Sequence, residues 1–169
     1  DDGKEEVIKG ANPRLEELLN VLEETQGGVI IWATFRRTIQ MIYDALAKKY
    51  GASRVATYYG ETESEVRQEI VEGFQKGDIK YFIGQPRTGG YGLTLTKAKT
   101  VIYFNNTYDM EVRLQSEDRA HRIGQTDKVT YIDFVAPKTI DEKILKTLSN
   151  KKKLADQITG DKWKELFNV

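Results

Sequence analysis

The chain has 169 residues, with 26 Lys and Arg against 26 Asp and Glu, 39% hydrophobic residues, one His and no Cys. This length suits one compact domain, which would bury roughly two-thirds of the surface that its unfolded chain exposes. Without cysteine there is no disulfide framework, thiolate nucleophile or zinc–thiolate site, and one His cannot build a multi-histidine metal centre. Because the formal net charge is zero, any nucleic-acid binding must rely on a local cluster of Lys and Arg.

The sequence offers no run of 18 apolar residues and no basic segment followed by an apolar one. We therefore expect neither a membrane span nor a signal peptide, and place the protein in the cytoplasm without a membrane partner. The chain does not begin with Met, and we interpret it as a segment of a longer protein, with removal of an initiator Met as the alternative.

Apolar residues at helical spacing alternate along the chain with short apolar runs typical of buried strands. Asn12 and Pro13 supply a cap and a first-turn proline for a first helix, which should end near Gly27. Further on, we predict strands at 29–33, 54–58, 81–83, 100–104 and 129–135, and helices at 39–50, 66–74, 111–120 and 140–148. Thr62 and Glu65 should form a capping box for the helix at 66–74. The mixed faces of 129–135 indicate an edge strand, and a lysine cluster and a short apolar tail follow the last helix.

About five alternations of strand and helix predict an α/β fold in three α/β/α layers, with a mostly parallel central sheet. In such sheets, ligands bind beyond the carboxyl ends of the strands. The glycine-rich loop at 84–92 follows one of these ends, and its backbone N–H groups suit phosphate oxygens. A tight strand-to-helix turn is the alternative interpretation of this loop.

A second feature is the pair Arg119 and Arg122, three residues apart. If the helix extends to Arg122, the two side chains project from one face about one turn apart, and their permanently charged guanidinium groups match a phosphate. The alternative for an arbitrary pair of this kind is a surface salt-bridge face, here with Glu117 and Asp118.

The segment 115–125, Gln-Ser-Glu-Asp-Arg-Ala-His-Arg-Ile-Gly-Gln, resembles motif VI of the Swi/Snf family of helicase-like ATPases, which double-stranded DNA stimulates. Residues 88–95 resemble that family's motif V and residues 29–35 its motif IV. Gly60, Arg67 and Phe74 fit the intervening motif, and residues 139–144 resemble the segment that closes the lobe. The sequences of residues 103–106 and 129–133 are most similar to those of family members encoded by bacteriophages and prophages.

The resemblance implies a RecA-like domain of the P-loop NTPase type. It divides the chain into an N-terminal extension or linker at 1–12, the helicase C-terminal (second RecA-like) lobe at 13–158 and a C-terminal tail at 159–169. No Gly-x-x-x-x-Gly-Lys-Ser/Thr loop is present. Asp141 and Glu142 are interpreted as acids of a first helical turn rather than as a Walker-B pair.

The same resemblance assigns nucleotide contacts. It implies that Arg122 is the arginine finger, that Arg119 also reaches the γ-phosphate of ATP, and that Gln115 orients the two arginines, while Gly90 and Gly92 let the backbone approach the nucleotide. The phosphates and the Mg²⁺ ion would be held by the absent first lobe, so this chain alone should not hydrolyse ATP. A finger arginine is worth about 10³ to 10⁵ in rate.

The implied partners are double-stranded DNA and the N-terminal RecA-like lobe of the same protein, in a bacterial or phage-infected cell. The DNA-binding candidates share one edge of the predicted sheet: Thr34, Phe35, Arg36, Gly60, Thr62, Arg87 and Thr88. Contacts to phosphate fix position without reading sequence, which suits a translocase or helicase. Two side chains also allow structural interpretations: Phe35 could pack at the start of a helix, and Arg67 could be a helix surface charge. No metal ligands are predicted in this chain.

Two other functions stay open. One is an autonomous nucleic-acid-binding RecA-like module without an ATPase role. The other is an unrelated small phosphate-binding α/β enzyme, which is disfavoured because the sequence offers no nucleophile-and-base pair, metal cluster or dinucleotide fingerprint.

Overall fold

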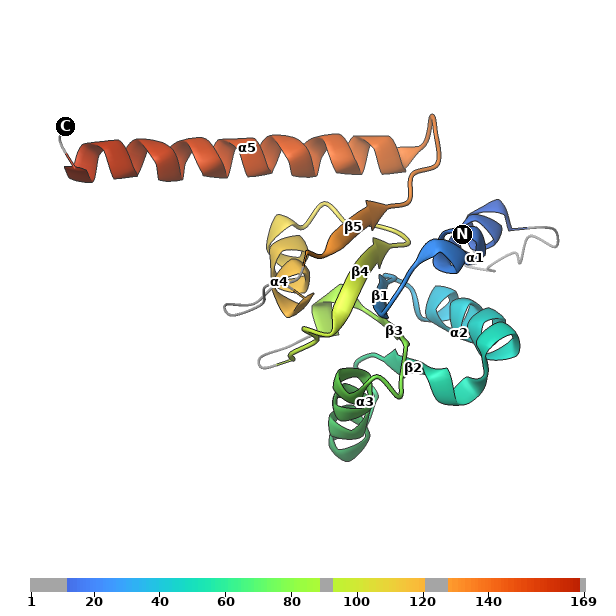
Figure 1. Cartoon of the computed structure of the whole chain (residues 1–169). Coiled ribbons are helices and arrows are strands. Elements are labelled where there is room, and N and C mark those ends of the chain that lie inside the picture. Colours follow the sequence, from blue (N-terminus) through green and yellow to red (C-terminus); the bar gives the residue numbers. More distant parts are fainter. Residues whose placement is uncertain (1–11, 89–92, 121–127, 168–169) are drawn as a thin grey trace.

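The computed structural model describes residues 12–88, 93–120 and 128–167, with side chains described as far as residue 154. The helices are α1 (Pro13–Glu24), α2 (Arg36–Tyr50), α3 (Ser64–Lys76), α4 (Met110–Ala120) and α5 (Ile140–Phe167), with short 3-10 turns at Ala52–Arg54 and Pro86–Thr88. The strands are β1 (Gly28–Trp32), β2 (Val55–Tyr58), β3 (Tyr81–Gly84), β4 (Ala98–Tyr103) and β5 (Thr130–Asp133), as Figure 1 shows.

The five strands form one sheet in the order β2-β3-β1-β4-β5, and all neighbouring pairs are parallel. β1 lies at the centre, where its residues pair with β3 on one side and β4 on the other. β5 is an edge strand, which confirms the interpretation of its mixed faces. A central parallel strand must be apolar on both faces, and Val29 to Trp32 are all buried.

Successive residues of β1 serve opposite layers of the fold. Ile31 packs in a core with Leu18 of α1 and Ile42 of α2, whereas Trp32 packs in a second core with Phe74 of α3. Ala120 of α4 belongs to that second core. Helices therefore cover both faces of the sheet, and the predicted three-layer α/β/α fold is confirmed.

The two predicted helix starts have different outcomes. The side chain of Asn12 accepts a hydrogen bond from the Leu15 N–H at 3.2 Å and caps α1, as predicted. The capping box at Thr62 and Glu65 is wrong, because α3 begins at Ser64 and its cap residue makes no side-chain hydrogen bond. The Thr62 hydroxyl instead accepts from the Tyr59 N–H at 3.1 Å, since it closes the turn that leads into α3.

The last helix is longer than the sequence pattern predicted. α5 runs without a break from Ile140 to Phe167, whereas we expected a helix at 140–148, a lysine cluster and a separate tail. Residues 151–157 are mostly Lys, Leu, Ala and Gln, which are good helix formers, so the helix continues beyond the part that packs on the lobe. Along the described residues, no helix combines the length and apolarity that a bilayer crossing needs.

The first turn of α5 is fixed to α1 by an ion pair. The Arg14 guanidinium donates to the Asp141 carboxylate and also, at 2.8 Å, to the Phe104 carbonyl. The Asp141 carboxylate accepts a further bond from the Ala136 N–H at 3.0 Å. Burial raises the pKa of the Asp141 carboxyl, but the Ala136 N–H and the Arg14 guanidinium outweigh it and hold the pKa below its ordinary value of 3.8.

We expect Asp141→Asn to lower the free energy of unfolding at neutral pH by about 1.5 to 3 kcal/mol, the range for hydrogen bonds to charged groups. Because the folded-state pKa is lowered, the stabilisation is complete above pH 3.8 and is lost as the pH falls through the folded-state value. Denaturant unfolding of both proteins should therefore show a difference that narrows below this pH. Glu142→Gln, an exposed acid in the same turn, is the control; an equal effect of this variant would contradict the assignment.

Candidate nucleotide and nucleic-acid interface

Four loops meet at the carboxyl edge of the sheet, and polar side chains fix them to one another. The Thr34 N–H donates to Asn105 Oδ1 at 2.7 Å, and Gln85 Nε2 donates to the Thr34 carbonyl at 2.9 Å. The Gln85 N–H donates to the Tyr58 carbonyl at 3.2 Å. We call the loops 33–35, 59–63, 85–88 and 104–109 the C-terminal rim. Gln85 and Asn105 were not predicted as site residues, although both follow strands in the sequence.

Two arginines at the C-terminal rim, Arg36 at the start of α2 and Arg87 in the loop 85–88, are paired with carboxylates. Arg36 donates to the two oxygens of Glu61 at 2.6 and 2.8 Å, and Arg87 donates to Asp109 at 2.9 Å. The side chains of Arg36 and Glu61 are 59% and 68% exposed. Exposed ion pairs of this kind contribute about 1 kcal/mol or less, so a phosphate group can displace the carboxylate.

Arg67 is not a free helix surface charge, so that alternative is wrong. Its Nε donates to the Thr62 carbonyl at 2.7 Å, and one terminal nitrogen donates to the Gly60 carbonyl at 2.8 Å. The guanidinium also lies 5.4 Å from the ring centre of Tyr58. Arg67 therefore shapes the turn that carries Gly60 and Thr62, two of the predicted DNA contacts.

The remaining rim candidates differ in accessibility. Phe35 precedes α2 and is 64% exposed, so it does not pack at the start of the helix and that interpretation is wrong. The Thr88 hydroxyl bonds to Gln85 Oε1 at 3.2 Å. The Thr34 hydroxyl is buried without a partner among the described atoms, and the Thr34 N–H and carbonyl bond to Asn105 and Gln85.

The arginine segment lies at the other end of α4. Asp109 accepts a hydrogen bond from the Val112 N–H at the start of this helix, at the C-terminal rim. The Arg119 carbonyl, near the helix end, accepts from the Leu95 N–H at 2.9 Å. The 11 residues of α4 span about 16 Å. The structure thus brings Arg119 to the end of the motif V loop and away from the C-terminal rim.

The Arg119 side chain is half-buried next to the end of the described part of α4. Glu117, one of its expected salt-bridge partners, instead accepts from Arg113 Nε at 2.6 Å. Within the described residues, no carboxylate pairs with Arg119. Gln115 donates back to Glu111 at 2.9 Å rather than forward to the arginine. Gly90, Gly92 and Arg122 lie outside the described residues.

A network around Arg113 was missed by the sequence analysis. Two of its nitrogens donate to the Asp133 carboxylate at 2.5 and 3.1 Å, and one also donates to Asn106 Oδ1 at 2.9 Å. The guanidinium lies 3.5 Å from the ring centre of Tyr103, whose hydroxyl is 2.7 Å from that of Ser116. No spacing signalled this role, because an arginine in a mostly polar helix is usually exposed.

The network keeps Arg113 charged and Tyr103 neutral. Burial lowers the pKa of the Arg113 guanidinium, but the Asp133 carboxylate outweighs it and holds the pKa above its ordinary range. Burial raises the pKa of the Tyr103 hydroxyl. Arg113 consequently joins α4 to the end of β5 and to the loop after β4.

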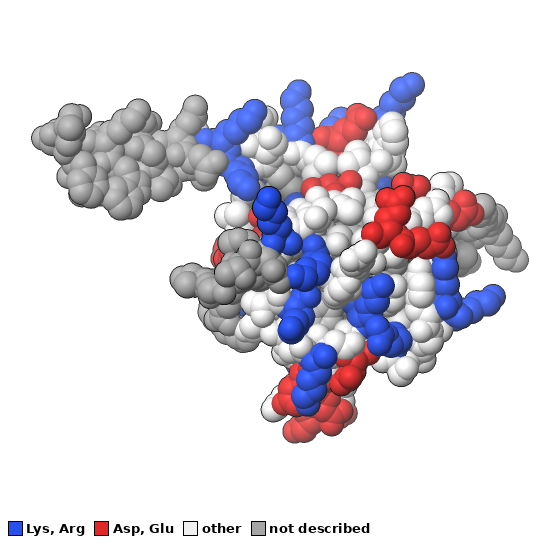
Figure 2. Space-filling model, in the orientation of Figure 1, with Lys and Arg blue, Asp and Glu red and all other residues white. Residues whose placement is uncertain are grey.

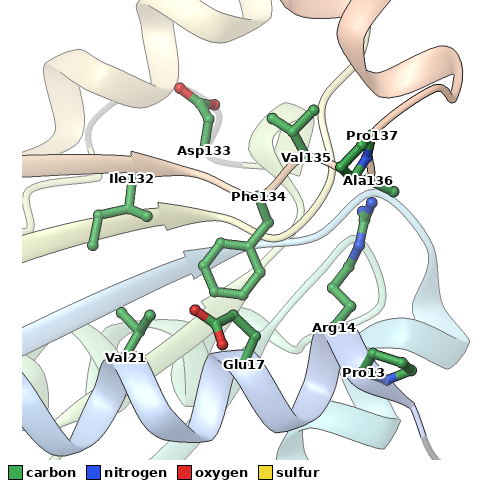
Figure 3. A pocket seen from close by; sticks show the side chains of 10 residues that line it. All are labelled: Pro13, Arg14, Glu17, Val21, Ile132, Asp133, Phe134, Val135, Ala136 and Pro137. Carbon is green, nitrogen blue, oxygen red and sulfur yellow. The ribbon is translucent and has the colours of Figure 1, made fainter.

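A pocket of about 450 Å³ lies between α1 and the segment 132–137. In Figure 3, Val21 and Glu17 of α1 point toward Ile132 and Phe134 across this pocket. None of the sequence-predicted site residues lines it. Within the described ranges, no group of three or more His, Cys, Asp or Glu side chains could hold a metal ion.

The fold and the ordered motifs define a helicase-type RecA-like lobe, and comparison with known proteins agrees. The model of the helicase conserved C-terminal domain matches residues 11–124. The chain belongs to this family. Its relatives are Swi/Snf-type ATPases, so it is a C-terminal lobe of that type.

Individual relatives cover most of this chain. It is 33% identical over 153 residues, or 90% of the chain, to the chromatin-remodeling ATPase INO80 of Candida albicans. It is 32% identical over 165 residues, or 95% of the chain, to the ATP-dependent helicase fft2 of Schizosaccharomyces pombe. These matches span 11% and 12% of the relatives' own lengths. The chain thus corresponds to only a small part of each.

A solved structure shows the same fold. The crystal structure of the C-terminal part of the Fun30 ATPase domain superposes with a TM-score of 0.73 at 27% sequence identity. The match covers 80% of this chain and 45% of that one.

Removing the Arg113 guanidinium should be costly because it leaves Asp133 and Glu117 partly buried without their partner. We expect Arg113→Ala to lower the free energy of unfolding by about 3 to 5 kcal/mol, as when one member of a buried pair is removed. Arg36→Ala, which breaks an exposed pair, should cost about 1 kcal/mol or less. Urea unfolding of the two variants tests this contrast, and equal losses would show that the Arg113 network does not stabilise the fold.

Proposed function

We propose that this chain is the second motor lobe of a Swi/Snf-type ATP-dependent translocase or helicase on double-stranded DNA. In this proposal, the lobe comprises residues 13–158, with a linker at 1–12 and a tail at 159–169; the last boundary falls inside α5. The lobe supplies the arginine finger and part of the DNA grip and is inactive as an ATPase without the first lobe. Its cytoplasmic location in a bacterial or phage-infected cell is a prediction.

The observation that carries the proposal is the contact between the two motif segments. The hydrogen bond from the Leu95 N–H to the Arg119 carbonyl joins the end of the motif V loop to the arginine segment of motif VI. The Arg119 side chain has no carboxylate partner among the described residues and can therefore meet a phosphate. A nucleotide at this place would contact both motifs at once.

Bound ATP would supply the phosphoryl group and Mg²⁺ would neutralise phosphate charge, and both would be held by the first lobe. In this lobe, Arg122 and Arg119 would neutralise charge on that group, and Gln115 would orient them. Gly90 and Gly92 would let the backbone approach the nucleotide. Because the arginines reach the phosphate only when two lobes close, hydrolysis would be coupled to lobe movement.

In the longer parent protein, Arg122→Ala should reduce DNA-stimulated ATP turnover about a thousandfold, because a finger arginine is worth 10³ to 10⁵ in rate. Duplex binding should be retained. Turnover by the wild type, Arg122→Ala and the exposed α5 variant Lys143→Ala is compared at saturating duplex. Wild-type turnover from the Arg122 variant, or no DNA stimulation of the parent, would favour the alternative of an autonomous nucleic-acid-binding module.

The ion pairs of the C-terminal rim give a second test. If Arg36 grips DNA phosphate, Glu61 competes with the phosphate for the same guanidinium. Glu61→Gln should therefore tighten duplex binding about three- to fivefold, which corresponds to about 1 kcal/mol for an exposed pair. Arg36→Ala should weaken it. Fluorescence anisotropy of a labelled duplex measures both affinities, and Glu63→Gln, two residues after Glu61, is the control. Unchanged affinity in both the Glu61→Gln and Arg36→Ala variants would show that Arg36 does not contact DNA.

A further inference from the structure

A row of cations lies along the amino edge of the sheet, opposite the C-terminal rim. Arg54 directly precedes β2, Lys80 precedes β3, Lys97 precedes β4, and Lys128 lies two residues before β5. Since the strands are all parallel, these positions lie at the same edge. With two neighbouring side chains, we call this set the N-terminal basic row: Arg54, Lys76, Lys80, Lys97, Lys99 and Lys128.

The members of the N-terminal basic row line two depressions that join. One, of about 400 Å³, is lined by the first five members, and the other, of about 600 Å³, by Lys99 and Lys128. Gly27 and Lys99 line both depressions. Gly27 has a φ of +73°, and a Cβ atom there would lie 2.6 Å from the Lys99 side chain. A larger residue at position 27 would therefore be strained and would displace Lys99, which lines both depressions.

Positive charge dominates this cleft. Glu24 is the one carboxylate among the described residues that line it. Lys76 has a partner in Glu72 at 3.6 Å, and Asp78 lies nearby in the turn before β3. In the part of the chain that the structure describes, no carboxylate pairs with the exposed Lys97 or Lys128. Figure 2 likewise shows Lys and Arg side chains gathered across the middle of one face of the molecule.

The length of the row suits an extended polyanion. Neighbouring strands lie about 4.8 Å apart, so the step from β2 to β5 covers roughly 19 Å. Successive phosphates of one DNA strand advance by about 3.4 Å along the helix axis, so the row can face about five nucleotides. A single small anion would use only part of it.

We propose that the N-terminal basic row binds the sugar–phosphate backbone of a nucleic acid. An acidic protein is the poorer match, because stable protein interfaces need buried aromatic or aliphatic anchors. None of the large exposed apolar side chains that the structure describes lines this cleft: Phe35, Val66, Tyr108, Leu114, Ile140 and Leu154. The site goes beyond the proposed function, since it lies on the edge opposite the C-terminal rim and lets one lobe hold two nucleic-acid segments.

The test is a charge reversal in the 169-residue chain. The variant Lys97→Glu with Lys128→Glu is compared with Lys143→Glu plus Lys146→Glu, an exposed pair on α5 with the same change in net charge. Binding of a labelled duplex of about 20 base pairs is measured between about 50 and 200 mM salt. The row variant should bind at least about tenfold more weakly at low salt, and its slope of log K against log salt should fall by about 2, since each phosphate contact contributes about 0.9.

Three outcomes would overturn the proposal: equal effects of the two pairs, no duplex binding by the wild-type chain, or binding of a polyglutamate peptide in place of the duplex. Amide chemical shifts recorded during the titration should move at residues 27, 97 and 128 in the wild type. The variant Arg36→Ala with Arg87→Ala separates the two edges. If only the Arg36→Ala, Arg87→Ala variant weakens duplex binding, the duplex binds at the C-terminal rim and the proposal for the N-terminal basic row is wrong. If only the Lys97→Glu, Lys128→Glu variant weakens duplex binding, the duplex binds at the N-terminal basic row.

Discussion

The direction of the strands is the constraint on which the rest of this structure depends. Because all five strands are parallel, every loop that follows a strand lies at one edge and every residue that precedes a strand lies at the other. The loops that lead away from β1, β2, β3 and β4 then form the C-terminal rim, although they are far apart in the chain. The same geometry collects Arg54, Lys80 and Lys97 into a row at the opposite edge. Two surfaces of different character arise from one topological fact.

Charge balance distinguishes these surfaces. At the C-terminal rim, Arg36 and Arg87 are each paired with a carboxylate, so their charges are balanced by neighbouring acids. At the amino edge, Glu24 is the one carboxylate among the described residues that line the cleft, and the exposed Lys97 and Lys128 have no carboxylate partner among the described residues. A chain with 26 cations and 26 anions can thus present one surface whose arginines are paired with carboxylates and another whose lysines have few acids beside them. Net charge alone would indicate neither.

The fold was largely predictable because its signals are local. Apolar runs such as Val29 to Ala33 specify buried strands, and Asn12 with Pro13 specifies a helix start, without reference to the rest of the chain. The family motifs identified the helicase C-terminal lobe, while the contact of the Leu95 N–H with the Arg119 carbonyl came from the structure. Errors occurred in the turn before α3, where side chains bond to backbone groups of the same turn: the Thr62 hydroxyl closes the turn instead of capping α3, and Arg67 binds loop carbonyls instead of solvent.

The Arg113 network illustrates what a one-dimensional pattern cannot contain. Its partners Asn106 and Asp133 follow or end different strands, and no residue spacing relates them. Yet this guanidinium joins the loop after β4, the end of β5 and the helix that carries Arg119. Since buried charged pairs are costly to break, α4 must move as one body with the edge of the sheet. Under the proposed function, a closure that brought Arg119 onto a nucleotide would therefore also move the C-terminal rim, and this rigidity would couple the two proposed sites.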